Sequence, residues 1–295
     1  MSRLNGYVNL LKPPGMSSAA AVAFVKRLTK EKCGHAGTLD PEVAGVLPVM
    51  VGRATRLQQF FSDKTKEYIG EISFTGATDT QDAQGRITEP GRGVPEVETL
   101  NGMIRARFLG EIMQIPPMFS AVKKEGEPLY AIARAGGTAD IAARPTYISA
   151  CEVLSRADDY TYRLHVSCGS GTYIRTLFHD LGQALGCPAH MRMLIRTRSG
   201  SFAMRDSVTC EALQAAAEAG ETEKCLLPMD WPLNEYRRVE MTEPLKPLAR
   251  NGVPIPLDLL SVQADETVAV YEAGIFYGMG QGCGDGFRMT FIAEP

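Results

Sequence analysis

The sequence predicts an α+β fold, because strand-like and helix-like segments both occur along it. Residues 68–74 and 162–168 alternate apolar and polar side chains with the two-residue period of a β-strand. Residues 17–30 and 172–185 instead repeat apolar side chains at the spacing of an amphipathic helix. We therefore expect helices packed on a sheet that holds these strands.

The first predicted helix begins at two serines, Ser17 and Ser18, which are typical N-cap residues. It is expected to run to about Lys30 and to be stopped by Gly34. Lys26 and Lys30 would then share one exposed face of the helix.

Two strands are expected next. In the apolar run 46–51, Pro48 indicates an edge strand or a bulge, because proline has no N–H for the sheet ladder. The second strand starts near Tyr68 and places that side chain on the mainly apolar face, where its hydroxyl needs a partner. Residues 76–95 have the composition of turns, and residues 100–109 that of a helix.

A long excursion follows from Gln114 to a short helix at residues 129–135. Long connections are often functional, and length alone equally allows a simple linker.

The helix after the strand at 162–168 begins at about Thr172, so Arg175 lies in its first turn. A cation there opposes the helix dipole. We therefore expect a carboxylate from another part of the chain to hold Arg175.

The chain changes character after Asp206. A helix is expected at residues 210–219, and small strands at 268–271, 275–277 and 287–291. Four alternating glycines between Gly280 and Gly286 resemble a nucleotide-binding loop, but no helix follows them, so a hairpin turn is favoured.

The net charge of −3 hides a strong asymmetry. Residues 1–62 contain eight Lys or Arg and three Asp or Glu, and residues 163–208 contain six and two. Residues 209–295 contain six and fourteen. Basic segments of this kind suit a nucleic-acid-binding surface, although solvated helix faces can also be basic.

The seven cysteines include no Cys-x-x-Cys pair, which argues against a disulfide framework and suits a reducing compartment. Cys168, His179, Cys187 and His190 match no zinc-module spacing, so no metal site is predicted. The apolar run 19–25 is too short to span a membrane, and no signal peptide is evident. We expect a cytoplasmic protein without a membrane association.

The segment GHAGTLDP, residues 34–41, concentrates polar and flexible residues in one loop. Gly34 and Gly37 permit close approaches, and Pro41 favours an extended conformation for Asp40. An Asp before Pro is often only a turn residue, so this loop alone leaves a structural role open.

Several segments, in this order, resemble the TruB family of pseudouridine synthases over about residues 5–205. They are LKPPGMSS (11–18), GHAGTLDP (34–41), GVLPV (45–49), GRATR (52–56), KEY (66–68), GTYIRTL (171–177) and MRML with RT (191–194 and 196–197). The order of several motifs is far more specific than any one of them.

This resemblance implies a pseudouridine synthase fold with a mixed, mainly antiparallel central sheet flanked by helices and loops. It places the catalytic domain at 1–232, with an RNA-covering insertion at about 112–145. The remaining residues, 233–295, resemble a small PUA-like RNA-binding β module, although their acidity is unusual for that role.

The resemblance also implies an activity: isomerisation of uridine to pseudouridine at position 55 in the T-loop of tRNA. The reaction has no net redox change and adds no group, so no cofactor is expected. Asp40 is the implied catalytic carboxylate, with Arg175 favouring its ionised form. Whether Asp40 attacks the ribose, attacks the uracil ring or removes a ribose proton stays open.

Four further roles are assigned around the uracil. Tyr68 is expected to stack on the base and to take the carbon-5 proton. His35 would fill the place that a flipped nucleotide vacates, and Tyr173 and Leu194 would line the pocket. Each of these side chains could instead be an ordinary core or surface residue.

Five basic residues are candidates for contacts with the RNA backbone: Lys12, Lys26, Lys30, Lys32 and Arg196. The expected partner is the T-arm of tRNA, bound by a monomer without an obligatory protein partner. Two alternatives remain: a tRNA-folding chaperone with secondary catalysis, and the catalytic subunit of a guide-RNA-dependent complex.

Overall fold

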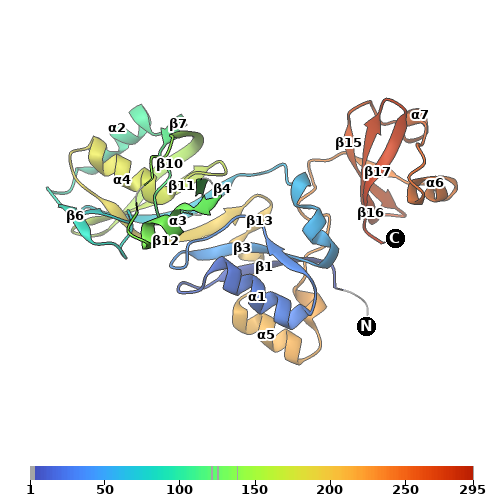
Figure 1. Ribbon diagram of the computed structural model, residues 1–295, viewed down its shortest axis with the longest axis horizontal. Helices are drawn as coiled ribbons and strands as arrows, with labels where there is room; N and C mark the ends of the chain where they lie inside the picture. Colours follow the sequence, from blue (N-terminus) through green and yellow to red (C-terminus); the bar gives the residue numbers. More distant parts are fainter. Residues whose placement is uncertain (1–3, 121, 125, 138, 295) are drawn as a thin grey trace.

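The structure is a computed structural model that describes residues 4–120, 122–124, 126–137 and 139–294. It has the α+β architecture that the sequence predicts (Figure 1). A large central sheet carries helices at both of its ends, and a small second sheet lies apart from it near the C-terminus. None of the described helices is both long and apolar enough to cross a bilayer.

The central sheet has nine strands, with the order β1-β3-β12-β4-β11-β10-β7 and with β2 and β13 attached to β3 and β12. Among the described strand pairs of this sheet, β3 and β12 are parallel and the others antiparallel. The prediction of a mixed, mainly antiparallel sheet is confirmed. The strands are β1 Gly6–Lys12, β2 Cys33–His35, β3 Ala44–Val51, β4 Lys66–Ser73, β7 Gly110–Gln114, β10 Arg144–Asp158, β11 Thr161–Cys168, β12 His190–Ser199 and β13 Phe202–Ala203.

Four helices cover this sheet: α1 Ser18–Thr29, α2 Val97–Arg107, α4 Ile174–Ala184 and α5 Cys210–Glu218. Helices α1 and α5 pack at the β1 and β3 end, whereas α2 and α4 pack near β10 and β12 (Figure 1). Ile174, Leu177, Phe178 and Leu181 of α4 are buried in the main core, as the helical pattern predicted. Short 3-10 helices occur at Gly52–Arg56, Gln58–Phe60, Met204–Asp206, Thr222–Cys225 and Glu243–Leu245.

The segments between these elements contain two hairpins. The turn-rich region 76–95 holds β5 Gly76–Thr78 and β6 Ile87–Pro90, which pair with each other. The excursion beyond Gln114 holds β8 Lys123–Lys124, β9 Glu127–Pro128 and the short helix α3 Leu129–Arg134.

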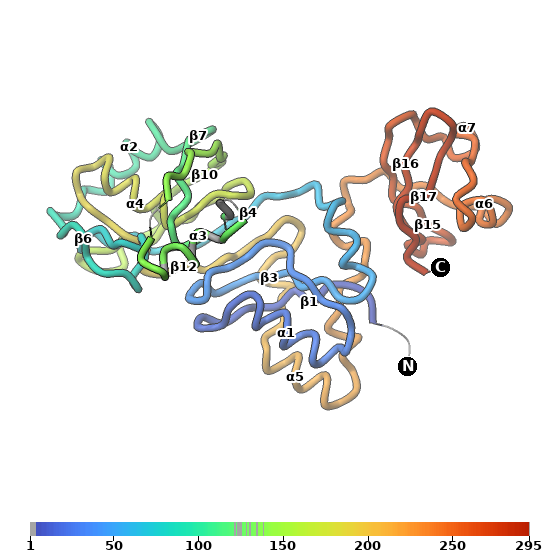
Figure 2. The backbone as a smooth tube through the Cα atoms, viewed as in Figure 1, coloured from blue at the N-terminus to red at the C-terminus, as the bar shows by residue number. Residues whose placement is uncertain are grey.

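The C-terminal sheet lies apart from the central sheet (Figure 2). It has the order β14-β15-β16-β17 and its own apolar core. Its elements are β14 Arg238–Glu240, α6 Lys246–Arg250, α7 Leu257–Leu260, β15 Thr267–Glu272, β16 Ile275–Cys283 and β17 Gly286–Ile292. The glycine run forms a hairpin, as expected, in which Cys283 pairs with Gly286. Gly280 is needed within β16, because a Cβ there would lie 2.0 Å from the Phe287 ring.

Two predictions for the first elements were wrong in detail. Helix α1 ends at Thr29 and is capped by Lys30, which adopts a left-handed conformation with φ of 57°, whereas Gly34, the predicted stop, lies in strand β2. Pro48 does not mark an edge or a bulge, because β3 lies inside the sheet and pairs in register with β1. On the other side of β3, the pairing with β12 ends at Gly45 and the pairing with β2 begins at Val49. Pro48 lies between these two paired stretches, where no ladder N–H is required.

Side chains from neighbouring segments hold the loop that carries Asp40 by binding its main-chain atoms. The ammonium of Lys12, which is fully buried, donates hydrogen bonds to the carbonyls of Pro13, Met16 and Pro41 at 2.6–2.9 Å. The hydroxyl of Ser18 donates to the Leu39 carbonyl and accepts from the Leu39 N–H, both at 2.8 Å. These contacts fix the residues on either side of Asp40.

Arg196 holds the other arm of the same loop. Its guanidinium is fully buried and donates to the carbonyls of Gly37, Thr38 and Val46. Since Lys12 and Arg196 are both withdrawn from solvent and bonded to main-chain carbonyls, the prediction that they contact RNA phosphates is contradicted by the structure. Both residues build the loop instead.

We expect the substitution Lys12→Met to destabilise the protein by about 3 kcal/mol, because it leaves three carbonyl oxygens without their donor. Chemical denaturation measures the change in the free energy of unfolding. Lys26→Met, at an exposed position of α1, is the matched control and should change it by no more than about 0.5 kcal/mol. Equal stability of the two variants would contradict the clamp role of Lys12.

Candidate active site

An ion pair joins the Asp40 loop to helix α4. The Oδ2 atom of Asp40 lies 2.9 Å from Nη2 of Arg175, in the first turn of α4. The Arg175 side chain is only 5% exposed, whereas 44% of the Asp40 side chain is exposed. The carboxylate is therefore held from the protein side and still faces open space, as a reactive group must.

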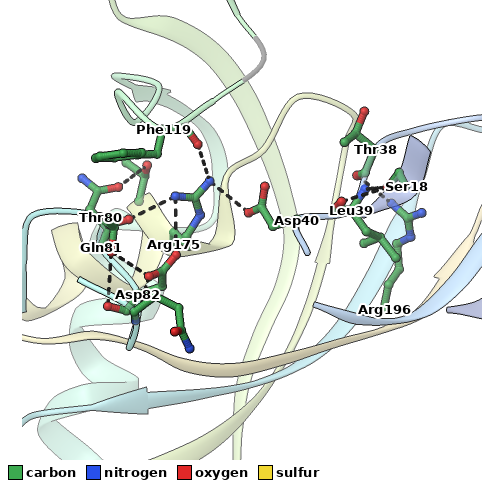
Figure 3. A network of polar contacts seen from close by, with 12 residues as sticks. Ser18, Thr38, Leu39, Asp40, Thr80, Gln81, Asp82, Phe119, Arg175 and Arg196 are labelled. Atoms are coloured by element: carbon green, nitrogen blue, oxygen red, sulfur yellow. Dashed lines mark hydrogen bonds and ion pairs between the residues drawn. The ribbon is translucent and has the colours of Figure 1, made fainter. Parts of the chain in front are cut away.

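Arg175 is bound by two other segments as well (Figure 3). Its guanidinium donates to the Thr80 carbonyl at 3.1 Å and to the Phe119 carbonyl at 2.9 Å. A second carboxylate, Asp82, lies 3.7 Å from Nη1. Residues of the β5–β6 hairpin and of the excursion after β7 thus converge on one cation, which offsets its unfavourable place at the helix N-terminus.

Sequence reasoning missed Asp82. Asp79 and Asp82 lie in the same turn-rich stretch, and Asp is a common turn residue at either position. The structure separates them, because Asp79 contacts Arg86 and the Asp82 side chain reaches Arg175. The one sequence feature that could have indicated a site here is the cluster of Asp and Thr residues at 78–82.

One cavity brings the predicted catalytic residues together. This Asp40 cavity has a volume of about 220 Å³ and is lined by Asp40, Tyr68, Tyr173, Arg175 and Leu194, among others. Strand β4 supplies Tyr68, β12 supplies Leu194, and the residue before α4 is Tyr173. Residues from four segments that are distant in sequence therefore line one cavity.

The walls of the cavity are fixed by buried contacts. Leu194 packs over Gly70, where a Cβ would lie 2.8 Å from Cδ1 of the leucine. The main chain of Tyr173 is bonded at both its N–H and its carbonyl to the Gln114 side chain, at 3.0 and 3.2 Å. The first residues of α4 are therefore locked to the end of β7.

Tyr68 is almost completely buried, and burial raises the pKa of its phenol above the ordinary value. The neighbouring Arg196 opposes this rise, because its positive charge lowers the pKa of the phenol. A phenol that stays protonated at neutral pH is suited to stacking and to hydrogen-bond donation. It is poorly suited to accepting a proton from carbon.

His35 lines a second, wider cavity of about 560 Å³ that Asp40 and Arg175 also border. Burial, and then the charge of Arg196, lowers the pKa of His35, so the ring is neutral at neutral pH. Its Nδ1 atom is buried and has no hydrogen-bond partner among the described residues. A half-buried neutral ring at the mouth of a polar site can pack against a base.

The remaining basic candidates are accessible. Lys26, Lys30 and Lys32 are exposed and follow one another through the end of α1 and the start of the next segment. Since α1 leads directly through β2 to the Asp40 loop, these three cations lie on the chain segment that approaches the site. The expected excursion reaches the site too, through Phe119 and Ser120.

Comparison with family models gives two adjoining matches. Residues 26–174 match the TruB family pseudouridylate synthase N-terminal domain, and residues 175–234 match the tRNA pseudouridylate synthase B C-terminal domain. The boundary between them falls at Arg175.

Similar proteins named tRNA pseudouridine synthase B occur in several bacteria. The one from Halalkalibacterium halodurans is 42% identical over 262 residues, which cover 86% of this chain and 85% of that protein. The one from Heliobacterium modesticaldum is 47% identical over 231 residues, which cover 77% and 74%.

Solved structures with the same fold include an H/ACA RNP bound to a substrate RNA, with a TM-score of 0.73 and 26% identity. A Cbf5-Nop10-Gar1 complex matches with a TM-score of 0.73 and 28% identity. Each match covers 98% of this chain and 85% of the other. The fold is therefore that of a pseudouridine synthase. Together with the two family models and the extent of the identity, it shows that this chain belongs to the TruB family of pseudouridine synthases.

Proposed function

We propose that this protein isomerises uridine to pseudouridine in tRNA, at position 55 of the T-loop. The observation that carries the proposal is the Asp40 carboxylate, held by Arg175 on the wall of a cavity that Tyr68 and Leu194 also line. Proteins named for this activity are identical to the chain at 42% and 47% of the aligned positions.

Asp40 is the catalytic carboxylate in this proposal. The reaction must break the bond between C1′ and N1, turn the uracil and join carbon 5 to C1′. An ionised carboxylate serves whether it attacks the ribose, attacks the ring or removes a ribose proton. In each case Arg175 supports the reaction by holding the carboxylate in place.

The uracil lies between Tyr68, Tyr173 and Leu194 in the proposed complex. Tyr68 stacks on the base and donates a hydrogen bond. Its raised pKa weighs against the proton-accepting role that the sequence suggested. Leu194 and Tyr173 supply apolar and aromatic contact on the other walls.

His35 assists the entry of the nucleotide. A uridine inside a folded loop must leave its stack, which costs a few kcal/mol and leaves a space behind. The neutral ring of His35, in the wider cavity beside Asp40, is placed to fill that space.

The tRNA backbone is bound, in this proposal, by the exposed cations Lys26, Lys30 and Lys32. The excursion at about residues 112–145 covers the RNA, and the C-terminal sheet, at residues 233–295, acts as a PUA-like RNA-binding module. The protein works as a monomer in the cytoplasm, without a cofactor.

One observation favours a second candidate. The solved structures that match over 98% of this chain come from H/ACA and Cbf5 complexes, in which the related chain is one of several components. A catalytic subunit directed by a guide RNA is therefore the alternative enzyme. A tRNA-folding chaperone with secondary catalysis would need the same cations but not Asp40.

Release of tritium from carbon-5-labelled uridine in a bare tRNA transcript tests the function. The purified protein alone should release one tritium per transcript, because only the uridine at position 55 loses its carbon-5 hydrogen. A transcript with cytidine at that position is the control and should release none. Release that requires a guide RNA or added proteins would favour the alternative complex.

Substitution of His35 tests the flipping role. We expect His35→Ala to raise the Kd for tRNA about tenfold, which corresponds to about 1.4 kcal/mol of binding free energy. The reason is that no side chain would then fill the space left by the unstacked nucleotide. Filter binding measures it, with His165→Ala on β11 as the matched control. An unchanged Kd together with an unchanged single-turnover rate would exclude insertion by His35.

A further inference from the structure

Lys66 lies at the wall between two cavities. It borders the Asp40 cavity and also a side cavity of about 200 Å³, lined among others by Lys64, Phe61 and Ser170. Lys66 precedes Tyr68 by two residues in β4, so the two side chains leave the strand on the same face. Lys66 therefore borders the same cavity as Tyr68.

No carboxylate forms an ion pair with Lys66 among the described residues. Its ammonium passes beside Gly37, where a Cβ would lie 3.4 Å from Nζ, and its charged neighbour is another cation, Arg196. The Arg196 guanidinium donates to main-chain carbonyls, which carry no net charge and so do not neutralise Lys66. Burial and the charge of Arg196 both lower the pKa of Lys66. A cation so placed lacks an anion.

A residue of the opposite charge, Asp40, lines the same cavity. Its carboxylate pairs with Arg175, not with Lys66. The cavity thus has a carboxylate on one wall, with its own counter-ion, and an uncompensated ammonium on another. This arrangement matches a reaction that separates charge within the bound nucleotide.

We propose that the Lys66 ammonium is a catalytic residue that stabilises the uracil while it is detached from the ribose. When the bond between C1′ and N1 breaks, its electron pair stays with the uracil, and the carbonyl oxygens of the base carry negative charge. Carbon 5 then supplies an electron pair to C1′ and loses its proton, and N1 gains one. The sum is an isomerisation, and Lys66 stays protonated throughout.

This inference rests on the proposed function and adds an electrostatic role on the base side of the cavity. Donors aimed at a charge that develops in the transition state are worth most in a closed, low-dielectric site. An RNA phosphate is the other anion that could reach a lysine. The inner position of Lys66, on the face that carries Tyr68, favours the base instead.

The test compares Lys66→Met with Lys66→Arg in single-turnover tritium release at saturating tRNA. We expect Lys66→Met to lower the rate constant roughly 100-fold, and Lys66→Arg to recover part of that loss because it keeps the charge. The Kd for tRNA and its salt dependence should stay as in the wild type. Lys64→Met, an exposed lysine of the side cavity, is the matched control and should leave the rate unchanged.

Three results would overturn the inference. A normal rate for Lys66→Met would remove the role altogether. A weaker Kd with a shallower salt dependence and a normal saturating rate would make Lys66 a phosphate contact. A loss shared equally by Lys66→Arg, with a lowered Tm, would make it structural. Because every rate is relative to active wild-type enzyme, failure of the proposed function itself would appear separately, as a wild type that releases no tritium.

Discussion

The ion pair between Asp40 and Arg175 is the contact on which the site depends. It links a loop between two strands to the first turn of a helix more than a hundred residues later in the chain. The cation is buried, so its charge must be matched, and Asp82 and two carbonyls complete its partners. Removing any one partner would leave a buried charge poorly satisfied. The same contact holds the Asp40 carboxylate at the cavity.

The sheet makes this contact possible because β3 and β12 run parallel. Their pairing brings Gly45 against the main chain of Arg196, where a Cβ would lie 2.2 Å from the Arg196 carbonyl oxygen. From that position the Arg196 side chain reaches back to the carbonyls of Gly37 and Thr38, and Lys12 holds Pro41. Two buried cations thus shape the loop through neutral carbonyls, which leaves the Asp40 carboxylate free to pair with Arg175.

Local patterns predicted part of this arrangement and missed the part that depends on tertiary contacts. Helix periodicity located Arg175 in a first turn, and the helix dipole implied a carboxylate partner, which the structure places at Asp40. The sequence pattern does not predict the long strand β10, because most of its side chains are exposed and its pairing with β11 contains bulges. The sequence predicts RNA contacts for Lys12 and Arg196, because it does not distinguish a solvated cation from one that is buried and bonded to carbonyls. Asp82 was missed because only the fold separates it from Asp79.

The central claim is that the Asp40 carboxylate performs the chemistry and contributes little to RNA binding. Single-turnover pseudouridine formation by Asp40→Asn, measured together with its Kd for tRNA, tests this most directly. The amide is nearly isosteric but is neither a nucleophile nor a base at neutral pH. The account predicts no detectable product and a Kd close to that of the wild type. Measurable turnover by Asp40→Asn would contradict it.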